Sequence, residues 1–388
     1  EINKMIDIEN GDPVILTKAL ISCRSVTPEN DGAIEQLAHW LKEVGFKCEI
    51  LNFKDDGTDD ILNLWARIGN EQGPALCFAG HTDVVPEGDE KSWSSAPFEA
   101  NEINGKIIGR GATDMKGAIA SFVSATKKFL DEKKNFAGSI SFIITGDEEG
   151  IAINGTKKLL NWMKEKNISF DDCIVGEPTN PKKLGEMIKI GRRGSVNGFL
   201  TVTGEQGHVA YPHFAKNPIP ILLNILNDLT SDDLDQGNEH FQPSNLEITS
   251  IDVGNKATNV IPNSASANFN IRYNNNFNKE TIESEINRRL KNFENKFSLE
   301  LDHSGESFLT KPGKLVNDLS EIIFDKTGIT PDLSTSGGTS DARFIKNYGN
   351  VVEFGLISET MHQIDESVDV KDIKDLTDIY YKVLTKYF

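Results

Sequence analysis

Apolar residues recur at two spacings along the chain, and the spacing predicts which segments are helices and which are strands. Helical spacing is found in seven segments, which are 12–41 (broken by a turn at 27–32), 115–130, 156–166, 217–229, 280–293, 315–327 and 370–386. Short apolar or alternating runs predict strands at 46–53, 62–68, 74–80, 139–145, 172–175, 195–203, 246–253, 264–273, 297–302 and 351–354.

The order of these elements predicts two domains. Strands and helices alternate before residue 194 and again after residue 305, which is typical of an α/β sheet. The segment between them reads βαββαβ, the split-βαβ pattern of a ferredoxin-like domain. We therefore predict a discontinuous α/β domain, 1–193 and 306–388, with a mixed, mostly parallel sheet flanked by helices. An α+β domain is inserted at 194–305. The length of 388 residues agrees with two hydrophobic cores.

Net charge, apolar content and cysteine number limit the kinds of molecule that the protein can be expected to bind. The net charge of −18 argues against nucleic acid, because phosphate binding needs a basic face. We find no apolar run long enough to span a membrane. Four cysteines without a C-x-x-C pair favour reduced thiols and a cytoplasmic setting. An anionic substrate would need local cations to overcome the overall negative charge.

Residues that can bind metals follow several of the predicted strands. The strand 139–145 leads to a triplet of carboxylates at 147–149, which taken alone is most simply a solvated acidic turn. Asp114 stands just before a helix, where capping would be its ordinary role. Taken together, the candidates are His81, Asp114, Glu148, Glu149, Glu177 and His362. Because sites in open α/β sheets gather at the carboxyl ends of strands, we expect these side chains to meet.

Two imidazoles and three carboxylates suit a pair of divalent ions, and zinc accepts such nitrogen and oxygen donors. A fourth carboxylate remains free to act as a base. Asp83, two residues after His81, could hold the imidazole in the tautomer that leaves its other nitrogen free for a metal. Such a site is suited to the hydrolysis of an amide or an ester.

Five motifs resemble the co-catalytic zinc amidohydrolases of the M20 peptidase family. They are H-T-D-V-V-P-E-G-D (81–89), G-R-G-A-T-D-M-K-G (109–117), T-G-D-E-E-G (145–150), G-E-P-T (176–179) and M-H-Q (361–363). Their order and number make the resemblance specific, and it covers nearly the whole chain. It implies a hydrolase that holds two Zn²⁺ per subunit, with Co²⁺ as a substitute, and whose inserted domain mediates dimerisation.

The resemblance also implies a role for each candidate. Asp114 matches the ligand that bridges the metals, with His81 and Glu177 on one ion and Glu149 and His362 on the other. Glu148 matches the general base that takes a proton from a metal-bridged water and passes it to the leaving amine. Asp83 matches the residue that orients His81. The peptide bond between Asp114 and Met115 is expected to be cis.

Four further motifs resemble the members of the family that cleave N-succinyl-LL-2,6-diaminopimelate to succinate and the diamino acid, a step of lysine synthesis. These are G-R-R-G-S (191–195), G-H-V-A-Y-P-H (207–213), N-V-I-P (259–262) and S-T-S-G-G-T-S-D-A-R-F (334–344). The implied substrate contacts are Arg192, Ser195, Tyr211, Asn259, Arg272, Ser304, Gly338, Thr339 and Arg343. The resemblance further implies a homodimer in which His208 reaches the partner's reaction intermediate.

One position departs from the family pattern. Four residues before the second metal-binding histidine the family usually has Asn, and this chain has Ser358. The shorter side chain puts one substrate contact in doubt and leaves the metal ligands unaffected.

Two alternatives stay open at this stage. Another member of the family, such as an acetylornithine deacetylase or an aminoacylase, would share the metal motifs but need no cation for the far end of its acyl group. A non-catalytic binding protein on the same fold would be expected to have lost a ligand or the base, whereas this chain keeps Glu148 and every ligand position.

Overall fold

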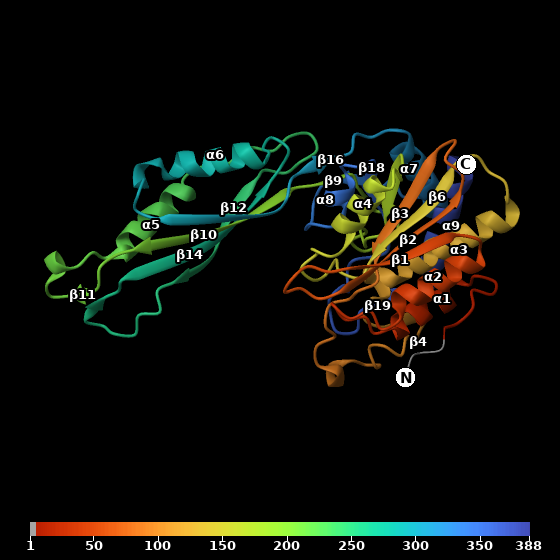
Figure 1. Cartoon of the computed structure of the whole chain (residues 1–388), viewed down its shortest axis with the longest axis horizontal. Helices are drawn as coiled ribbons and strands as arrows, with labels where there is room; N and C mark the ends of the chain where they lie inside the picture. The colour runs from red at the N-terminus through yellow and green to blue at the C-terminus, as the bar shows by residue number, and fades with distance from the viewer. Residues whose placement is uncertain (1–4) are drawn as a thin grey trace. The chain divides into compact units, whose positions relative to one another are not determined.

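The computed structural model describes residues 5–388, which form two compact units (Figure 1). The first unit takes in the chain up to Ile190 with Thr310–Ser334 and Ser340–Phe388, and the second takes in Gly191–Leu309 and Thr335–Thr339. The sequence prediction kept 335–339 with the α/β domain. This segment groups with the second unit, where Arg192 Nη1 donates to the carbonyl of Gly338 at 2.7 Å.

An eight-stranded sheet forms the centre of the first unit, in the order β1-β2-β6-β3-β7-β18-β8-β17. Its strands are β1 (Lys47–Phe53), β2 (Ile61–Gly69), β3 (Ala75–His81), β6 (Ser139–Thr145), β7 (Asp172–Val175), β8 (Met187–Lys189), β17 (Asp332–Ser334) and β18 (Asn350–Glu353). Strands β6, β3, β7 and β18 run parallel to their neighbours in that series, and β1, β2 and β6 pair antiparallel. The predicted mixed α/β sheet is confirmed.

The sequence prediction missed several short strands. Strands β8 and β17 have three residues each, as do the members of a separate small sheet, β4 (Asn101–Ile103), β5 (Lys106–Ile108) and β19 (Ser367–Asp369). A three-residue segment holds too little of the alternating pattern to be recognised.

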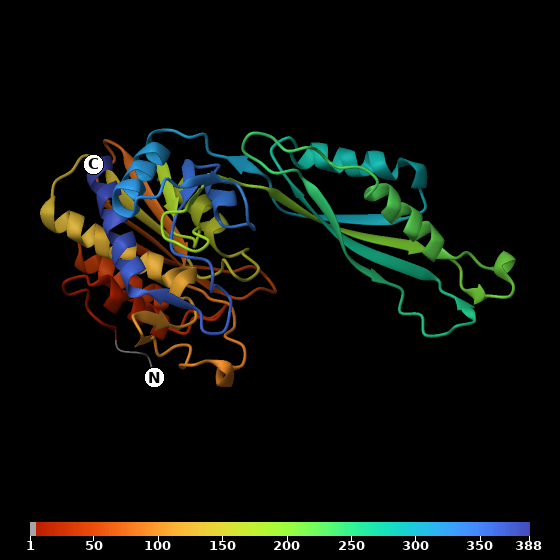
Figure 2. The same cartoon turned by 180° about the vertical axis from the view of Figure 1, so that it is seen from behind.

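Helices cover both faces of the large sheet. They are α1 (Pro13–Ser22), α2 (Ala33–Glu43), α3 (Gly117–Glu132), α4 (Thr156–Glu165), α7 (Lys314–Thr327), α8 (Ala342–Ile345) and α9 (Val370–Tyr387). Helices α3 and α9 pack side by side (Figure 2). They meet one face through Phe78, which stacks on Phe122 at a ring distance of 4.3 Å and contacts Tyr380. On the opposite face Trp65 of β2 contacts Trp162 of α4.

Two further observations concern the chain between residues 5 and 388. None of its helices combines the length and apolar character needed to cross a bilayer. Its four cysteines are unpaired, although Cys77 of β3 and Cys173 of β7 stand opposite each other in the sheet.

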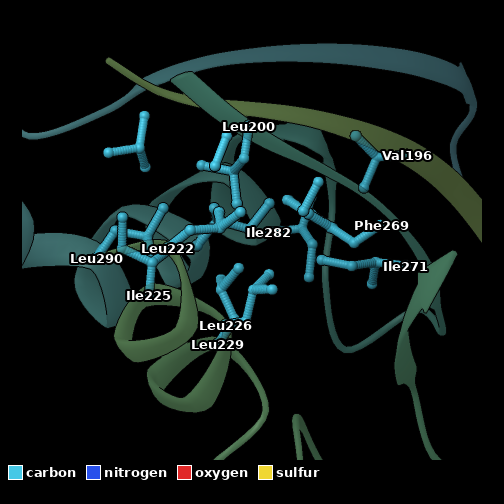
Figure 3. Close-up of a cluster of buried hydrophobic side chains, with 14 of the residues drawn as sticks. Val196, Leu200, Leu222, Ile225, Leu226, Leu229, Phe269, Ile271, Ile282 and Leu290 are labelled. Atoms are coloured by element: carbon cyan, nitrogen blue, oxygen red, sulfur yellow. The ribbon is translucent and has the colours of Figure 1, made fainter. Parts of the chain in front are cut away.

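The second unit has the expected βαββαβ order. The strands of its main sheet are β10 (Gly194–Thr203), β12 (Asn245–Asp252), β14 (Ser264–Tyr273) and β15 (Ser298–Gly305), and its longer helices are α5 (Pro218–Leu229) and α6 (Lys279–Leu290). Two short pairs, β9 (Gly191–Arg192) with β16 (Phe308–Leu309) and β11 (Gly207–His208) with β13 (Val260–Ile261), accompany this sheet. The antiparallel sheet has the order β12-β14-β10-β15. Residues of β14 alternate between buried and half-buried. Buried side chains such as Phe269 and Ile271 pack against Leu222 and Ile282 of the helices (Figure 3).

Candidate metal centre and active site

Candidate ligands are brought together at the carboxyl ends of the parallel strands. His81 is the last residue of β3, Glu148 and Glu149 follow β6, and Glu177 follows β7. His362 lies in the loop after β18. Since these four strands are neighbours in the sheet, their ends supply one edge with imidazole and carboxylate groups.

Asp114 reaches this edge from an irregular turn, η2 (Ala112–Lys116), that precedes α3. The strand ends make room for the turn by glycine: a Cβ on Gly80 would lie 2.4 Å from the methyl carbon of Met115, and one on Gly176 2.9 Å. The Asp114–Met115 bond is cis, as the family resemblance implied. Helix α3 begins only at Gly117, so the capping explanation of Asp114 is wrong.

The two carboxylate oxygens of Asp114 face different histidines. Its Oδ1 lies 3.2 Å from His81 Nε2, and its Oδ2 lies 3.0 Å from His362 Nε2. His81 Nε2 is also 3.7 Å from Glu177 Oε1, and His362 Nε2 is 2.8 Å from Glu149 Oε1. Asp114 therefore joins two ligand groups, one with His81 and Glu177 and one with His362 and Glu149.

These residues fit a pair of metal ions. Two donors that each lie about 2.0–2.1 Å from a tetrahedral zinc ion are about 3.3 Å apart, which is the range of separations seen here. His81 Nε2 and Asp114 Oδ1 are buried and have no hydrogen-bond partner within residues 5–388. Buried polar atoms without a partner are costly, and a cation between them would remove that cost.

The three carboxylates at 147–149 point to different neighbours. Asp147 is buried, which raises the pKa of its carboxyl group, and it lies beside the loop that follows, where a Cβ on Gly150 would come within 2.4 Å of its Oδ1. Glu148 Oε2 instead lies 3.8 Å from His81 Nε2, and Glu149 contacts His362. The explanation of the triplet as a solvated turn is wrong.

Asp83 acts on the site through two different groups. Its backbone carbonyl lies 2.8 Å from His81 Nδ1 and accepts a hydrogen bond from it, which leaves Nε2 free to bind a metal. Its carboxylate accepts the backbone N–H groups of Glu148 at 3.1 Å and Glu149 at 2.9 Å. The Asp83 carboxylate also lies 3.6 Å from His81 Nδ1, so both the main chain and the side chain of Asp83 face the ring, and its role in orienting His81 stays a prediction.

Close packing of like and unlike charges shifts the pKa values of the site. Burial and the charge of Glu177 raise the pKa of Glu148 well above its ordinary value. Hydrogen bonds to Asp114 and Glu149 raise the pKa of His362 to about 10. Burial opposes ionisation of Asp114, but the two imidazoles lower its pKa well below the usual range. A raised carboxyl pKa suits a group that must take up and release a proton.

The second unit holds most of the expected substrate contacts, in two groups. Near the start of β10, the Ser195 hydroxyl accepts from Asn270 Nδ2 at 3.1 Å, and Asn270 Oδ1 accepts from Arg272 Nε at 3.0 Å. Arg192 and Gly338 bond to each other, Thr339 follows directly, and Ser304 lies on the neighbouring strand β15. These residues form what we call the arginine end of the second unit.

A second group lies beyond the other end of β10, on β11 (Gly207–His208) and β13 (Val260–Ile261). There the rings of His208 and Tyr211 are 5.6 Å apart, and the carbonyl of Asn259 accepts from Val209 N. Strand β10 is ten residues long, so about 30 Å of strand separates this histidine end from the arginine end. Within one chain the two groups cannot contact the same small molecule.

Two further residues belong to the first unit. Arg343 belongs to α8 in the first unit, where its guanidinium lies over the ring of Phe344 at 4.6 Å. Ser358, the residue that departs from the family pattern, donates its hydroxyl to the backbone carbonyl of Asn180 at 3.3 Å.

Some buried charged residues at the site were not singled out from the sequence. Asp341 accepts a hydrogen bond from Thr156 at 2.6 Å, and burial raises its pKa to about 6. Lys116 donates to the carbonyl of Cys23 at 2.6 Å, and burial lowers its pKa to about 8. Lys116 lies in the motif 109–117 and Asp341 in the motif 334–344. A charged residue beside a small or apolar one within a motif was the sequence signal that could have identified them.

Comparison with known proteins assigns the chain to a class. Residues 77–386 match the peptidase family M20/M25/M40. The chain therefore belongs to this family of hydrolases. Solved structures with the same fold include aminopeptidase PepT from Bacillus cereus, at 20% identity and a TM-score of 0.77 with 99% and 100% of the two chains covered. Another is a dinuclear metal-binding M20 peptidase from Bacillus subtilis, at 18% identity and a TM-score of 0.67 with 97% of each chain covered.

More similar relatives carry a narrower description. The chain is 54% identical over 386 residues to the succinyl-diaminopimelate desuccinylase of Methylorubrum extorquens, which covers 98% of this chain and 100% of the relative. It is 51% identical to that of Rhodospirillum centenum, with 97% of each chain covered, and 50% identical to that of Pelagibacter ubique, with 97% and 98% covered.

Proposed function

We propose that the protein hydrolyses N-succinyl-LL-2,6-diaminopimelate to succinate and LL-2,6-diaminopimelate. The observation that carries this proposal is identity of 50–54% over nearly the full length to relatives with that name, combined with two ligand groups joined by Asp114. The reaction is the hydrolysis of an amide, for which the family and the residues of the site are suited.

Two zinc ions are proposed as the resident metals, with cobalt as an alternative. His81 and Glu177 would hold one ion, Glu149 and His362 the other, and Asp114 both. When bound, a pair of such ions lowers the pKa of water and stabilises negative charge on the scissile carbonyl oxygen. The mixture of imidazole and carboxylate donors supports zinc without excluding cobalt.

Glu148 is proposed as the general base. Its Oε2 lies 3.8 Å from His81 Nε2, and His81, Glu148 and Glu177 together could also hold an ion, so the assignment as base follows the T-G-D-E-E-G motif and the raised pKa of Glu148. Glu148 would take the proton of the attacking water and deliver it to the nitrogen of the leaving amine. Asp83 supports this role because its carboxylate fixes the backbone N–H of Glu148.

Specificity for a dicarboxylic acyl group is proposed to come from the arginine end. Arg192 and Arg272 can each pair with a carboxylate, and the guanidinium fork matches two carboxylate oxygens at once. Their hydrogen bonds to Gly338 and Asn270 hold the side chains toward the same end of the sheet. Ser195, Ser304 and Thr339 are proposed as the further polar contacts of this end, and Arg343 of the first unit is proposed as a separate substrate contact.

A homodimer is proposed because the second unit separates its own candidates. His208, Tyr211 and Asn259 lie about 30 Å of strand away from Ser195 and Arg272, so a second subunit is needed to bring both groups to one substrate. His208 of the partner subunit would donate a hydrogen bond to the developing oxyanion. Unpaired cysteines support a reducing compartment such as the cytoplasm.

The decisive test is steady-state hydrolysis of N-succinyl-LL-2,6-diaminopimelate beside N-acetylornithine, with zinc supplied and then chelated. We expect zinc-dependent turnover with a strong preference for the succinylated substrate. Preference for the acetylated substrate would leave the metal site in place and overturn the assignment of the arginines. Turnover of neither substrate by zinc-loaded protein would favour a binding protein.

A further inference from the structure

Arg110 and Glu366 form an ion pair in the interior of the first unit. Arg110 Nη1 lies 2.8 Å from Glu366 Oε2, and the two side chains are 3% and 0% exposed. Removing both charges from water costs several kcal/mol per ion unless further hydrogen bonds satisfy the remaining atoms. The partners of those atoms therefore show what the pair contributes.

The Glu366 carboxylate holds the backbone of the residue that joins the two ligand groups. Its Oε1 accepts the N–H of Asp114 at 3.0 Å and the N–H of Thr113 at 3.2 Å. Its own carbonyl accepts the N–H of Gly109 at 2.9 Å. The segment that carries Asp114 is thus tied to Glu366 at three points.

Arg110 extends the connection to two other loops. Nη1 also donates to the carbonyl of Gln363 at 3.0 Å, and Nη2 donates to the carbonyl of Pro86 at 3.2 Å. The guanidinium lies 5.3 Å from the centre of the Trp93 ring. Gln363 directly follows His362, and Pro86 is three residues after Asp83. One buried guanidinium therefore connects the loops of Asp83, Asp114 and His362.

The two histidines depend on this connection to different degrees. His81 ends strand β3, is 1% exposed, and has its Nδ1 fixed by the carbonyl of Asp83. His362 lies on a loop, has a backbone φ of +63° and a side chain that is 46% exposed. Besides its contacts with Asp114 and Glu149, the contact of Arg110 with the carbonyl of Gln363 is the hydrogen bond nearest to His362 that joins its loop to a buried side chain, while Asp365 ties the far part of the loop to Ser94.

We propose that Arg110 and Glu366 are positioning residues that set the metal affinity of the Asp114–Glu149–His362 group. This inference rests on the proposed two-metal site. Groups that orient metal ligands without touching the metal change affinity by about 10–100-fold when they are removed. Because Asp114 belongs to both ligand groups, loss of the pair should weaken both metal-binding steps. The step that involves His362 should weaken more than the step at His81, whose ring is held by β3 and the carbonyl of Asp83.

The test compares Glu366→Gln and Arg110→Lys with the wild type. Lysine keeps the buried positive charge but loses the fork that reaches both carbonyls, so Arg110→Lys decides the question if Glu366→Gln does not fold. Metal-free protein is titrated with Zn²⁺ against a chromophoric chelator, which resolves the two dissociation constants. Visible absorption spectra with one and two equivalents of Co²⁺ then report the geometry of each site. Glu285→Gln is the matched control, because it removes the carboxylate partner of Arg289, another guanidinium that is only 4% exposed, within α6.

We expect one zinc dissociation constant to rise at least tenfold in both variants and the other to rise less, with an altered spectrum for the cobalt ion at the more weakened site. The Glu285→Gln protein should bind zinc with the dissociation constants of the wild type. Wild-type dissociation constants in a variant with a lower melting temperature would show a purely structural ion pair and overturn the inference. Equal weakening of both steps would also overturn it. A wild-type protein that binds no zinc would instead overturn the proposed function.

Discussion

Glu148 is the residue whose chemistry separates metal binding from catalysis. Glu148→Ala should retain the fold and two zinc ions but lose about 10²–10⁴-fold in kcat, because only proton transfer is removed. Turnover and bound zinc, measured on the same preparation, check this expectation. Glu149→Ala provides the contrast, since its contact with His362 predicts loss of zinc as well. Near-normal turnover of Glu148→Ala would contradict its role as the base.

Arg272 is the residue that should distinguish acyl groups. Arg272→Ala is expected to lower kcat/KM for the succinylated substrate by about 10–100-fold, since a hydrogen bond to a charged group contributes about 1.5–3 kcal/mol. Activity on an acetylated analogue should stay unchanged. Arg288→Ala, an exposed arginine paired with Glu285 on α6 of the same unit, is the control. An equal loss on both substrates would assign Arg272 a structural role.

His362 predicts how zinc binding depends on pH. Its pKa of about 10, raised by Asp114 and Glu149, means that the metal-free imidazole is protonated near neutral pH. Because the contact raises the folded pKa above 6.5, its stabilisation of the metal-free protein is complete below pH 6.5 and is lost as the pH rises through about 10. Zinc must displace this proton, so affinity should increase with pH over that range.

Calorimetric titration in two buffers of different ionisation enthalpy measures the protons released by zinc binding. We expect release of at least about one proton per subunit near pH 7.5, and less from His362→Ala. Zinc binding without proton release would contradict the protonated state of His362.

Helix α6 shows how a single element depends on a partly buried carboxylate and the two arginines that contact it. The guanidinium groups of Arg288 and Arg289 lower the pKa of Glu285 to about 2. Arg289 also donates to the carbonyls of Leu229 and Asp232, which connects α6 to the end of α5. Because the folded pKa is depressed, the stabilisation is present above pH 4.5 and is lost as the pH falls through about 2.

Glu285→Gln should therefore loosen α6 at pH 6 and much less near pH 2.5. Hydrogen–deuterium exchange of peptides covering Lys279–Leu290, compared with the wild type at each pH, measures the effect. A difference from the wild type that is the same at both pH values would show that the carboxylate charge contributes nothing.

At the scale of the whole molecule, the proposed dimer predicts that two inactive variants restore activity when they form a mixed dimer. The His208→Ala subunit lacks the histidine that would act in the partner's site, and the Glu148→Ala subunit lacks the base of its own site. A mixed dimer would contain one complete site, so unfolding and refolding an equal mixture should restore about a quarter of wild-type activity. Each variant refolded alone is the control. A mixture as inactive as its components would show that His208 does not act across subunits.

Much of the architecture could be predicted because it depends on local patterns. Long periodic segments such as those of α9 and β14 were recognised, and so was the βαββαβ order of the inserted unit. Strands β8 and β17 were missed, since their three residues pair only with distant segments. The grouping of 335–339 with the second unit was missed for the same reason: its bond to Arg192 spans 146 residues.

The amino-acid sequence by itself determined which ligand types stand at the strand ends and how the two domains are built, because alternation, helical period and motif order are local properties. Tertiary structure decided which of the carboxylates at 147–149 turns inward, that the carbonyl of Asp83 accepts a hydrogen bond from His81, and that Arg110 meets Glu366. These outcomes depend on segments up to 256 residues apart whose approach is set by the packing of the sheet. No local pattern records such distances, and so the supporting contacts of the site could be found only in the folded chain.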